Sequence, residues 1–407
     1  MGMKLNIAVV VQRFGKEVVG GAETHAKLLI EQLTNELKWQ VTVYTTTAKN
    51  YSTWAPHFAP GRTEENNISI LRFDVDQNRS PLFGIYNKLY KILFHLPIPK
   101  KIKILLENLW MYLQGPNSKL LEKQIFLDQS KYRLILFFTY LYPTTNQILP
   151  KISVPTVLIP TAHNELAFYF NTTKILFENA SYIYANTNVE KNLITEHYPS
   201  VLKKTKVVGL GFDQKRQTPP NQKSRQKPYL LYLGRIGRSK NVHTLAKYFS
   251  EFLSANPTSE LELVLAGEYD DGFHLSHHKN VTSLGYISDS DKDELLTNAV
   301  ALVSASYFES LAMIVLEAIA VKTPVIAAEQ CPLFREYAAT LSSVHSYRNS
   351  AEFSTVLEDV TSRRHTADLA SAAESSLKWL KEHLAWHKVL TKYKSLEQDC
   401  SSKGELN

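Results

Sequence analysis

Residues 229–241 read YLLYLGRIGRSKN. The first five residues form a continuous apolar run, which is typical of a parallel strand that is covered on both faces. A glycine turn follows this run, and two cations, Arg235 and Lys240, come after the glycine. A strand followed by a glycine turn and cations is typical of a phosphate site at the carboxyl edge of a doubly wound α/β sheet.

The same alternation of short apolar runs and longer amphipathic stretches extends in both directions from this segment. The apolar runs predict strands, and the amphipathic stretches predict helices. The predicted strands are 5–11, 41–46, 68–73, 134–138, 156–159, 182–185, 229–233, 261–266, 281–284, 301–304 and 324–327, and the main predicted helices are 22–33, 189–197, 242–253, 291–298 and 311–320. Alternating β and α elements predict parallel, doubly wound sheets.

Residues 213–228 interrupt this alternation, because they are polar, basic and proline-containing and have no apolar run. Such a composition is typical of a linker between domains. We therefore predict a Rossmann-like domain over 1–212, a linker over 213–228, a second Rossmann-like domain over 229–380, and a C-terminal helix and tail over 381–407. That helix is expected to pack back towards the first domain. A chain of 407 residues is long enough for two domains.

The composition is that of an ordinary globular protein with a modest basic excess. The formal net charge is +7, which fits a partner that carries phosphates, but charge alone does not distinguish a nucleotide from a lipid or a nucleic acid. Only Cys331 and Cys400 are present, so no disulfide framework is available and a reducing compartment is expected. No signal-peptide layout and no apolar run of about 18 residues occurs. These features predict a cytoplasmic protein, with the inner face of the membrane as an open alternative.

One segment of the first half is unusually basic. Residues 77–106 contain no carboxylate, whereas six basic residues lie between Arg79 and Lys103, interleaved with aromatic and aliphatic side chains. This segment is either a surface helix with a solvated basic face or a peripheral docking site for an anionic membrane. No nucleic-acid-reading motif accompanies it, so no nucleic-acid partner is predicted.

The second informative motif is residues 307–331, YFESLAMIVLEAIAVKTPVIAAEQC. Glu309 and Glu317 are eight residues apart, which at about 100° per residue places them roughly 80° apart around a helix. Ser310 is the expected N-cap, which leaves Glu309 in the loop just ahead of the helix. A helix start is a natural phosphate site, and its free N–H groups are expected at Leu311, Ala312 and Met313. Glu317 could accept hydrogen bonds from ribose hydroxyls, and the alternative is two glutamates on a surface helix.

Taken together, these motifs resemble the family 4 retaining glycosyltransferases of GT-B architecture, which have two Rossmann-like domains facing a central cleft. The resemblance covers nearly the whole chain. It implies that Arg235 and Lys240 bind the donor diphosphate, that Glu309 contacts the donor sugar near the reacting carbon, and that Glu317 binds the ribose. It also implies that the segment LGYIS, with Tyr286 and Ile287, contacts the nucleobase.

Two features of the first half extend the resemblance. Gly20-Gly21-Ala22-Glu23 resembles the glycine loop near the donor phosphate, which assigns Gly21 to that site, although an ordinary βα turn has the same pattern. His163, in PTAHNELAF, matches the histidine that lines the sugar pocket, and the alternative is a structural histidine.

Three positions depart from the family pattern. Many relatives have glycine where this chain has Ala312, and the glycine expected before Pro324 is replaced by Lys322-Thr323. Asn164 stands where an aspartate often follows the histidine. These differences leave the identity of the donor sugar open.

The resemblance implies transfer of a hexosyl group, with retention, from a nucleoside diphosphate sugar to a glycan or lipid-linked acceptor in cell-surface polysaccharide or glycolipid biosynthesis. No Asp-x-Asp metal motif is assigned, so a metal-free mechanism is expected, with no further cofactor. Two alternatives remain, namely a non-catalytic sugar-nucleotide-binding subunit and a sugar-nucleotide epimerase of the same fold. A nicotinamide dehydrogenase is disfavoured because no G-x-G-x-x-G follows the first strand.

Overall fold

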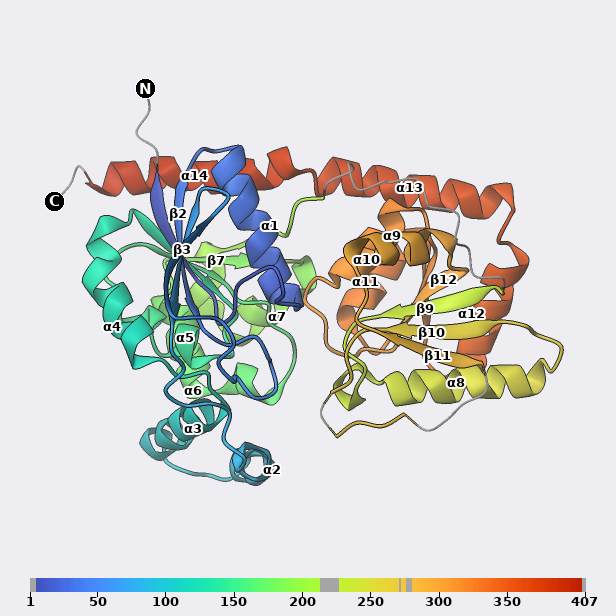
Figure 1. The fold of residues 1–407 in the computed structure, drawn as a ribbon, viewed down its shortest axis with the longest axis horizontal. Coiled ribbons are helices and arrows are strands. Elements are labelled where there is room, and N and C mark those ends of the chain that lie inside the picture. The colour runs from blue at the N-terminus through green and yellow to red at the C-terminus, as the bar shows by residue number, and fades with distance from the viewer. Residues whose placement is uncertain (1–4, 213–226, 271, 276–279, 405–407) are drawn as a thin grey trace. The chain divides into compact units, whose positions relative to one another are not determined.

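The computed structural model describes residues 5–212, 227–270, 272–275 and 280–404, which form two compact units (Figure 1). The first unit is Met1–Gly211 with Trp386–Asn407, and the second is Phe212–Ala385. The later boundary lies at Ala385 rather than at residue 380, because helix α13, Ala367–His383, continues past that point. Most of the expected linker, 213–226, lies outside the described residues.

The first unit is built on an eight-stranded sheet with the order β3-β4-β2-β1-β5-β6-β7-β8. Its strands are β1 Asn6–Val10, β2 Gln40–Thr46, β3 Gly61–Glu65, β4 Ile68–Phe73, β5 Leu134–Phe138, β6 Thr156–Ile159, β7 Tyr182–Ala185 and β8 Thr205–Val207. All pairs are parallel except β3 with β4. The expectation of a purely parallel sheet is therefore wrong at this edge, where the polar strand GRTEE adds an antiparallel pair.

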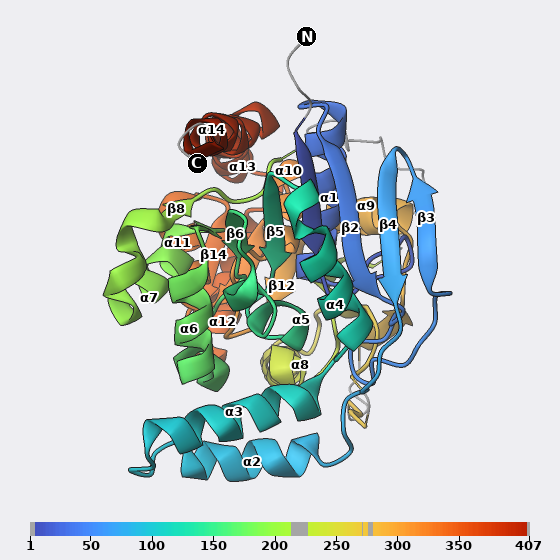
Figure 2. The same cartoon turned by 90° about the vertical axis from the view of Figure 1, so that its left-hand side faces the viewer.

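Helices cover both faces of this sheet, which explains the continuous apolar runs of its inner strands. On β1, Ile7 and Val9 pack with the helices of one face, and Ala8 and Val10 with those of the other. The first face carries α1 Gly21–Asn35 and α14 Trp386–Gly404. The other helices of this unit (Figure 2) are α2 Phe83–Leu93, α3 Lys100–Gln114, α4 Lys119–Asp128, α5 Pro143–Asn146, α6 Asn171–Asn179 and α7 Asn188–His197.

The second unit contains a six-stranded, wholly parallel sheet with the order β11-β10-β9-β12-β13-β14. Its strands are β9 Tyr229–Leu233, β10 Glu262–Ala266, β11 Val281–Gly285, β12 Ala301–Ser304, β13 Val325–Ala328 and β14 Val344–Tyr347. Besides α13, its helices are α8 Val242–Ala255, α9 Asp289–Asn298, α10 Met313–Ala320, α11 Pro332–Thr340 and α12 Ser350–Ser362. None of the helices in the described part of the chain is long and apolar enough to cross a membrane.

Among the parallel strands, the order reverses direction between β1 and β5 in the first unit and between β9 and β12 in the second. Ligands of doubly wound sheets bind beyond the carboxyl ends of the strands at such a switch point. The loops that follow these four strands are therefore the places where a functional site is expected. They include the segments that follow β9 and β12, where Lys240 and Glu309 lie.

The buried His25 on α1 predicts that the stability of the protein depends on pH. Its ring lies edge-on to Phe138, and burial lowers its pKa from 6.5 to about 3. The folded protein therefore keeps His25 neutral, whereas the unfolded chain protonates it below pH 6.5. Stability from this group is complete above pH 6.5 and decreases as the pH falls towards 3.

Denaturant unfolding at pH 7.5 and pH 5.0 measures this effect. Lowering the pH from 7.5 to 5.0 should reduce the free energy of unfolding by about 2 kcal/mol through His25 alone, at 1.36 kcal/mol per pH unit below 6.5. His25→Leu should remove that share of the pH dependence, whatever its effect at pH 7.5. An equal pH dependence in the variant and the wild type would contradict the expectation.

Candidate functional site

Glycines lie at the carboxyl ends of three neighbouring strands of the second unit. Gly234 and Gly267 directly follow β9 and β10, Gly285 is the last residue of β11, and their φ values are 141°, 143° and 67°. Gly267 donates its N–H to the Gly285 carbonyl at 2.8 Å, and a Cβ on Gly267 would lie 1.9 Å from the Gly234 carbonyl oxygen. A side chain cannot be accommodated at Gly267, and the edge of the sheet offers bare backbone to a ligand.

The loops after β9 and β12 meet at the switch point of the second sheet. Lys240 Nζ lies 2.5 Å from Glu309 Oε1, and both side chains are about one-fifth exposed. Asn241, which has a left-handed φ of 53° at the start of α8, donates its side-chain amide to the Ala305 carbonyl at 3.1 Å. The structure thus brings together the predicted phosphate cation and the predicted sugar-contacting carboxylate, which are 69 residues apart in the chain.

The second predicted cation, Arg235, lies on the same loop but has a different partner. Its guanidinium is 3.7 Å from the carboxylate of Asp270, which also accepts a hydrogen bond from Ser239 at 3.3 Å. The Tyr232 hydroxyl donates to the Arg235 carbonyl at 2.6 Å, which holds the turn in place. Sequence reasoning missed Asp270, although its position just after β10 places it at the same edge of the sheet.

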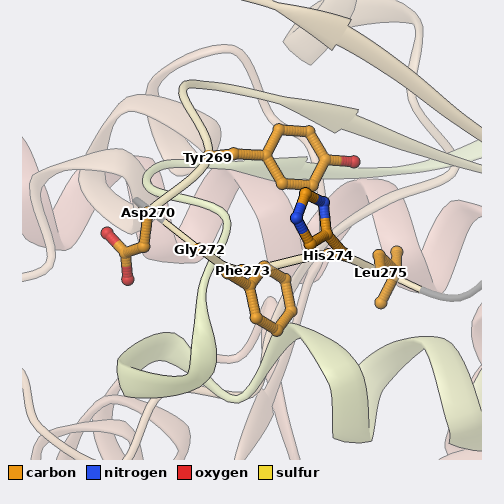
Figure 3. A pocket seen from close by; sticks show the side chains of 6 residues that line it. All are labelled: Tyr269, Asp270, Gly272, Phe273, His274 and Leu275. Carbon is orange, nitrogen blue, oxygen red and sulfur yellow. The ribbon is translucent and has the colours of Figure 1, made fainter.

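Asp270 also lines a cavity of about 470 Å³ in the connection that follows β10 (Figure 3). The other lining residues are Tyr269, Gly272, Phe273, His274 and Leu275. The rings of Tyr269 and Phe273 are stacked, with their centroids 6.2 Å apart. The cavity adjoins the Arg235 loop through Asp270 and through the backbone bridge between Ile236 and Tyr269.

Helix α10 begins later than the sequence predicts. Ala312 is the N-cap residue in place of Ser310, and the first helical residue is Met313 in place of Leu311. The buried Tyr337 donates its hydroxyl to the Leu311 carbonyl at 2.7 Å and so holds the preceding loop outside the helix. The amides at the helix start are therefore those of Met313 and Ile314, since Val315 N–H donates to the Ala312 carbonyl at 2.8 Å.

Glu309 lies in the loop after β12, ahead of the helix, as the sequence predicts. Glu317 is on α10, about one-quarter exposed, and its carboxylate lies 2.9 Å from Lys292 Nζ of α9. Lys292 also lies 3.3 Å from Asp289. Lys292 was missed because its pairing with Glu317 depends on how two separate helices pack.

Tyr286 and Ile287, the residues expected to contact a nucleobase, follow directly on Gly285. Tyr286 is 62% exposed and Ile287 is half-buried. Ser288 then caps α9 by accepting the Asp291 N–H at 3.1 Å. The pair therefore lies between the glycine at the end of β11 and the start of α9.

Asp-x-Asp spacing does occur in the chain, at Asp289–Asp291 and Asp291–Asp293, and it lies on the first turns of α9. Asp289 and Asp291 occupy the helix start, where negative charge is favourable. Asp289 pairs with Lys292, and Asp291 accepts the Ser288 hydroxyl at 2.7 Å. Within the described ranges, no group of three or more His, Cys, Asp or Glu residues is arranged to hold a metal ion.

Ala312 and Lys322 both adopt the left-handed backbone conformation, with φ values of 50° and 65°. These are the positions where the sequence departs from the expected glycines. The left-handed conformation costs a non-glycine residue roughly 1–2 kcal/mol. Glycine avoids this cost but stabilises the unfolded chain by roughly 0.4–1 kcal/mol through its greater conformational entropy, which is the smaller effect.

We therefore expect Ala312→Gly and Lys322→Gly each to raise the free energy of unfolding by about 0.5–1 kcal/mol. Ala370→Gly is the matched control, because Ala370 is an exposed residue inside α13 and glycine there should cost about 1 kcal/mol. Denaturant titration measures all three. Destabilisation by Ala312→Gly would contradict this interpretation.

In the first unit, the predicted glycine loop surrounds a buried ion pair. Arg13 Nη2 lies 2.7 Å from Glu23 Oε1, which also accepts a hydrogen bond from Gln12 at 2.8 Å. A Cβ on Gly20 would lie 2.2 Å from the Glu23 carboxylate, whereas a Cβ on Gly21 would meet nothing within 4 Å. Gly20 is thus required by the packing of the fold, while Gly21, at the start of α1, borders open space. Sequence reasoning missed Gln12 and Arg13.

His163 lies in the loop after β6 and belongs to a polar chain of three side chains. Its Nε2 is 3.3 Å from Glu165 Oε1, and the Tyr140 hydroxyl donates to the same oxygen at 2.6 Å. Burial and the neighbouring carboxylate raise the pKa of Tyr140 well above its ordinary value, so it remains a donor. Glu165 thereby orients the ring of His163. Sequence reasoning did not assign Glu165 or Tyr140.

A second carboxylate holds the backbone of this loop. The buried Glu190 of α7 accepts the Ala162 N–H at 2.5 Å and the Asn186 N–H at 2.6 Å. Burial raises the pKa of Glu190 to about 8, an effect that these two N–H donors oppose. Thr161, with a φ of 52°, completes the turn before His163.

Known proteins resemble this chain in sequence. The family model for Glycosyl transferases group 1 matches residues 213–373. Mannosylfructose-phosphate synthase of Agrobacterium fabrum is 25% identical over 183 residues, which cover 40% of this chain and 40% of that protein. Spore coat protein SA of Bacillus subtilis is 22% identical over 273 residues, covering 59% and 72%. D-inositol 3-phosphate glycosyltransferase of Paenarthrobacter aurescens is 25% identical over 232 residues, covering 50% and 55%. The chain thus spans 40% to 72% of the length of these relatives.

Solved structures match over nearly the whole chain. Sucrose-phosphate synthase from Thermosynechococcus elongatus superimposes with a TM-score of 0.70 at 16% identity, covering 98% of this chain and 100% of that one. The Anabaena protein HepE, solved in complex with UDP and glucose, gives a TM-score of 0.64 at 15% identity with the same coverage. The chain therefore has the two-domain GT-B fold of these proteins, and its second half matches the group 1 glycosyl transferase family.

Proposed function

We propose that this protein is a glycosyltransferase that moves a hexosyl group from a nucleoside diphosphate sugar to a hydroxyl of a glycan or lipid-linked acceptor, with retention at the anomeric carbon. The observation that carries the proposal is the contact between Lys240 and Glu309 at the switch point of the second sheet. A cation there can hold the leaving diphosphate, and the carboxylate beside it can contact the sugar that the diphosphate leaves.

The donor diphosphate would be bound by the two cations and by backbone N–H groups. Arg235 can form two parallel hydrogen bonds to phosphate oxygens, whereas Lys240 acts as a mobile point charge. The amides of Met313 and Ile314 at the start of α10 add donors and the positive end of the helix dipole. These groups stabilise the negative charge that develops on the diphosphate as the glycosidic bond breaks.

The other parts of the donor would be bound by residues around this centre. Glu317, held by Lys292, would accept hydrogen bonds from the ribose hydroxyls, and the segment of Tyr286 and Ile287 would contact the base. For the first unit we propose that Gly21 leaves room for the close approach of a phosphate and that His163 positions a sugar. The phosphate oxygen that leaves the sugar would take the proton of the acceptor hydroxyl, so no side chain is needed as a base.

A panel of nucleotide sugars tests the proposal. UDP-glucose is the first to try, because HepE was also solved in complex with it. We expect release of the nucleoside diphosphate from one donor, and an unchanged anomeric configuration in the transferred sugar by NMR. Lys240→Gln should slow the release by about 30-fold or more, whereas Lys247→Gln, on an exposed lysine of α8, should leave it unchanged. Binding of no nucleotide sugar in calorimetry, or inversion in the product, would overturn the proposal.

A further inference from the structure

Helices α2 and α3 form a hairpin that is firmly attached to the first unit (Figure 2). The Tyr86 hydroxyl donates to the Leu106 carbonyl at 3.0 Å, and the Trp110 indole donates to Asn87 at 3.0 Å. Glu107, which is fully buried, accepts the Thr172 N–H of α6 at 2.9 Å. The inner side of the hairpin therefore packs as part of the protein core.

The outer side of the hairpin is also apolar, which is unusual for a solvent-exposed surface. Five exposed side chains recur at intervals of three and four residues from Leu82 to Leu96, and four more do so from Ile102 to Tyr112. These nine residues, here called the hairpin face, are Leu82, Ile85, Leu89, Ile92, Leu96, Ile102, Leu105, Leu109 and Tyr112, and they are 42% to 68% exposed. They are half of the 18 large hydrophobic residues that the described part of the chain exposes.

Lysines flank both stripes of the hairpin face. At about 100° per residue, Lys88 lies roughly 80° from the centre of the α2 stripe, and Lys101 roughly 60° from the centre of the α3 stripe. Lys91 and Lys100 are exposed as well, and the only carboxylate of residues 77–114 is the buried Glu107. These four lysines give the hairpin a positive charge that no exposed carboxylate of the segment balances.

The two other basic residues of this segment are used inside the protein. The Arg79 guanidinium lies over the rings of Tyr51, Trp54 and Phe83, with distances of 5.2–5.6 Å to the centroids. Lys103 donates to the Phe94 carbonyl at 2.9 Å. The exposed basic residues of this segment are therefore Lys88, Lys91, Lys100 and Lys101.

We propose that the hairpin face docks the protein onto the surface of an anionic lipid bilayer. The aliphatic stripes would lie among the outer parts of the acyl chains, and Lys88 and Lys101 beside them would reach the headgroup phosphates, each adding roughly 1 kcal/mol near the surface. Lys91 and Lys100 lie roughly 140° and 160° from the centres of their stripes and would add longer-range attraction. Protein interfaces favour aromatic residues, Met and Arg and are depleted in Lys. The hairpin face has one aromatic residue, and the basic residues of α2 and α3 are all lysines, so the composition favours a lipid partner.

Sedimentation of the full chain with vesicles tests this proposal, and since no nucleotide is needed, its outcome is independent of the proposed function. Vesicles of phosphatidylcholine alone are compared with vesicles that also contain phosphatidylglycerol. We expect binding to the anionic vesicles that weakens as salt is added. Replacing Lys88, Lys91, Lys100 and Lys101 by Gln should weaken binding by tenfold or more. Replacing Ile85 and Ile92 by Asn should do the same.

Matched variants exclude general effects of charge and surface polarity. Four exposed lysines elsewhere in the first unit, Lys16, Lys123, Lys203 and Lys206, are changed to Gln, and Leu127 and Leu202, which are 64% and 55% exposed, are changed to Asn. These controls should bind vesicles like the wild type, and circular dichroism checks that every variant is folded. No binding of the wild type to anionic vesicles, or equal binding of the hairpin variants, would overturn the proposal. Self-association that the Ile85 and Ile92 changes abolish, without vesicle binding, would assign the face to a second copy instead.

Discussion

Replacing Arg235 or Lys240 by alanine is expected to lower the rate of sugar transfer by about 30-fold to several-thousand-fold, because removing one cation from a largely desolvated charge pair costs about 2–5 kcal/mol. A departing diphosphate carries two or more negative charges. The start of α10 supplies only about half a positive charge, so the two side chains must provide the rest. Lys240 already contacts Glu309, and Arg235 lies beside Asp270, so each change also leaves a carboxylate without its cation.

Initial rates with the donor found in the panel measure this effect. Lys247→Ala serves as the control, because Lys247 is 70% exposed and pairs only with Glu251 of its own helix by a contact of 3.8 Å. A chelator should leave the wild type active, since the cations replace a metal in this mechanism. Full activity of Arg235→Ala, or complete loss of activity with chelator, would show that the metal-free diphosphate site is wrong.

Glu317→Gln is expected to weaken the binding of free nucleoside diphosphate by tenfold or more, which corresponds to about 1.4 kcal/mol. The carboxylate is the proposed acceptor for both ribose hydroxyls, and its contact with Lys292 at 2.9 Å holds it in place. Glu309→Gln should act differently and lower turnover mainly. It removes the carboxylate that competes with the diphosphate for Lys240, so nucleotide affinity should be unchanged or higher.

Calorimetry with the free diphosphate and initial-rate kinetics separate the two roles. Glu374→Gln is the control for loss of a carboxylate, because Glu374 is 60% exposed and pairs only with Lys322. Unimpaired nucleotide affinity in both Glu309→Gln and Glu317→Gln would contradict the assignment, as would an equal loss of affinity in both.

The inner strands of both sheets could be predicted from the sequence because helices bury them on both faces. A strand covered by helices on both faces must be apolar at every position, as in LILFF at β5. The polar edge strand β3 was missed because it has no apolar signal and depends on pairing with β4. The sequence predicts one basic segment where the structure has the hairpin of α2 and α3. The pattern of lysines does not show which apolar side chains of this segment face the core.

The start of α10 shows where local signals fail. Ser310 is a good N-cap residue, and the sequence alone favours a helix from Leu311. In the folded protein, Tyr337 holds the Leu311 carbonyl and Ala312 takes the left-handed conformation, which moves the helix start to Met313. A hydrogen bond from a residue 26 positions away thus overrides the local preference.

Apolar runs and the polar stretch between them sufficed to predict two α/β domains, and to place the candidate residues Arg235, Lys240 and Glu309 after apolar strands. Those features follow from burial and chain continuity, which act locally. The ion-pair partners could not be predicted and follow from the fold, namely Lys240 with Glu309, Arg235 with Asp270, and Glu317 with Lys292. Each pair joins segments that meet because the sheet order places their strands or helices together, and that order depends on the packing of the whole unit rather than on any local pattern.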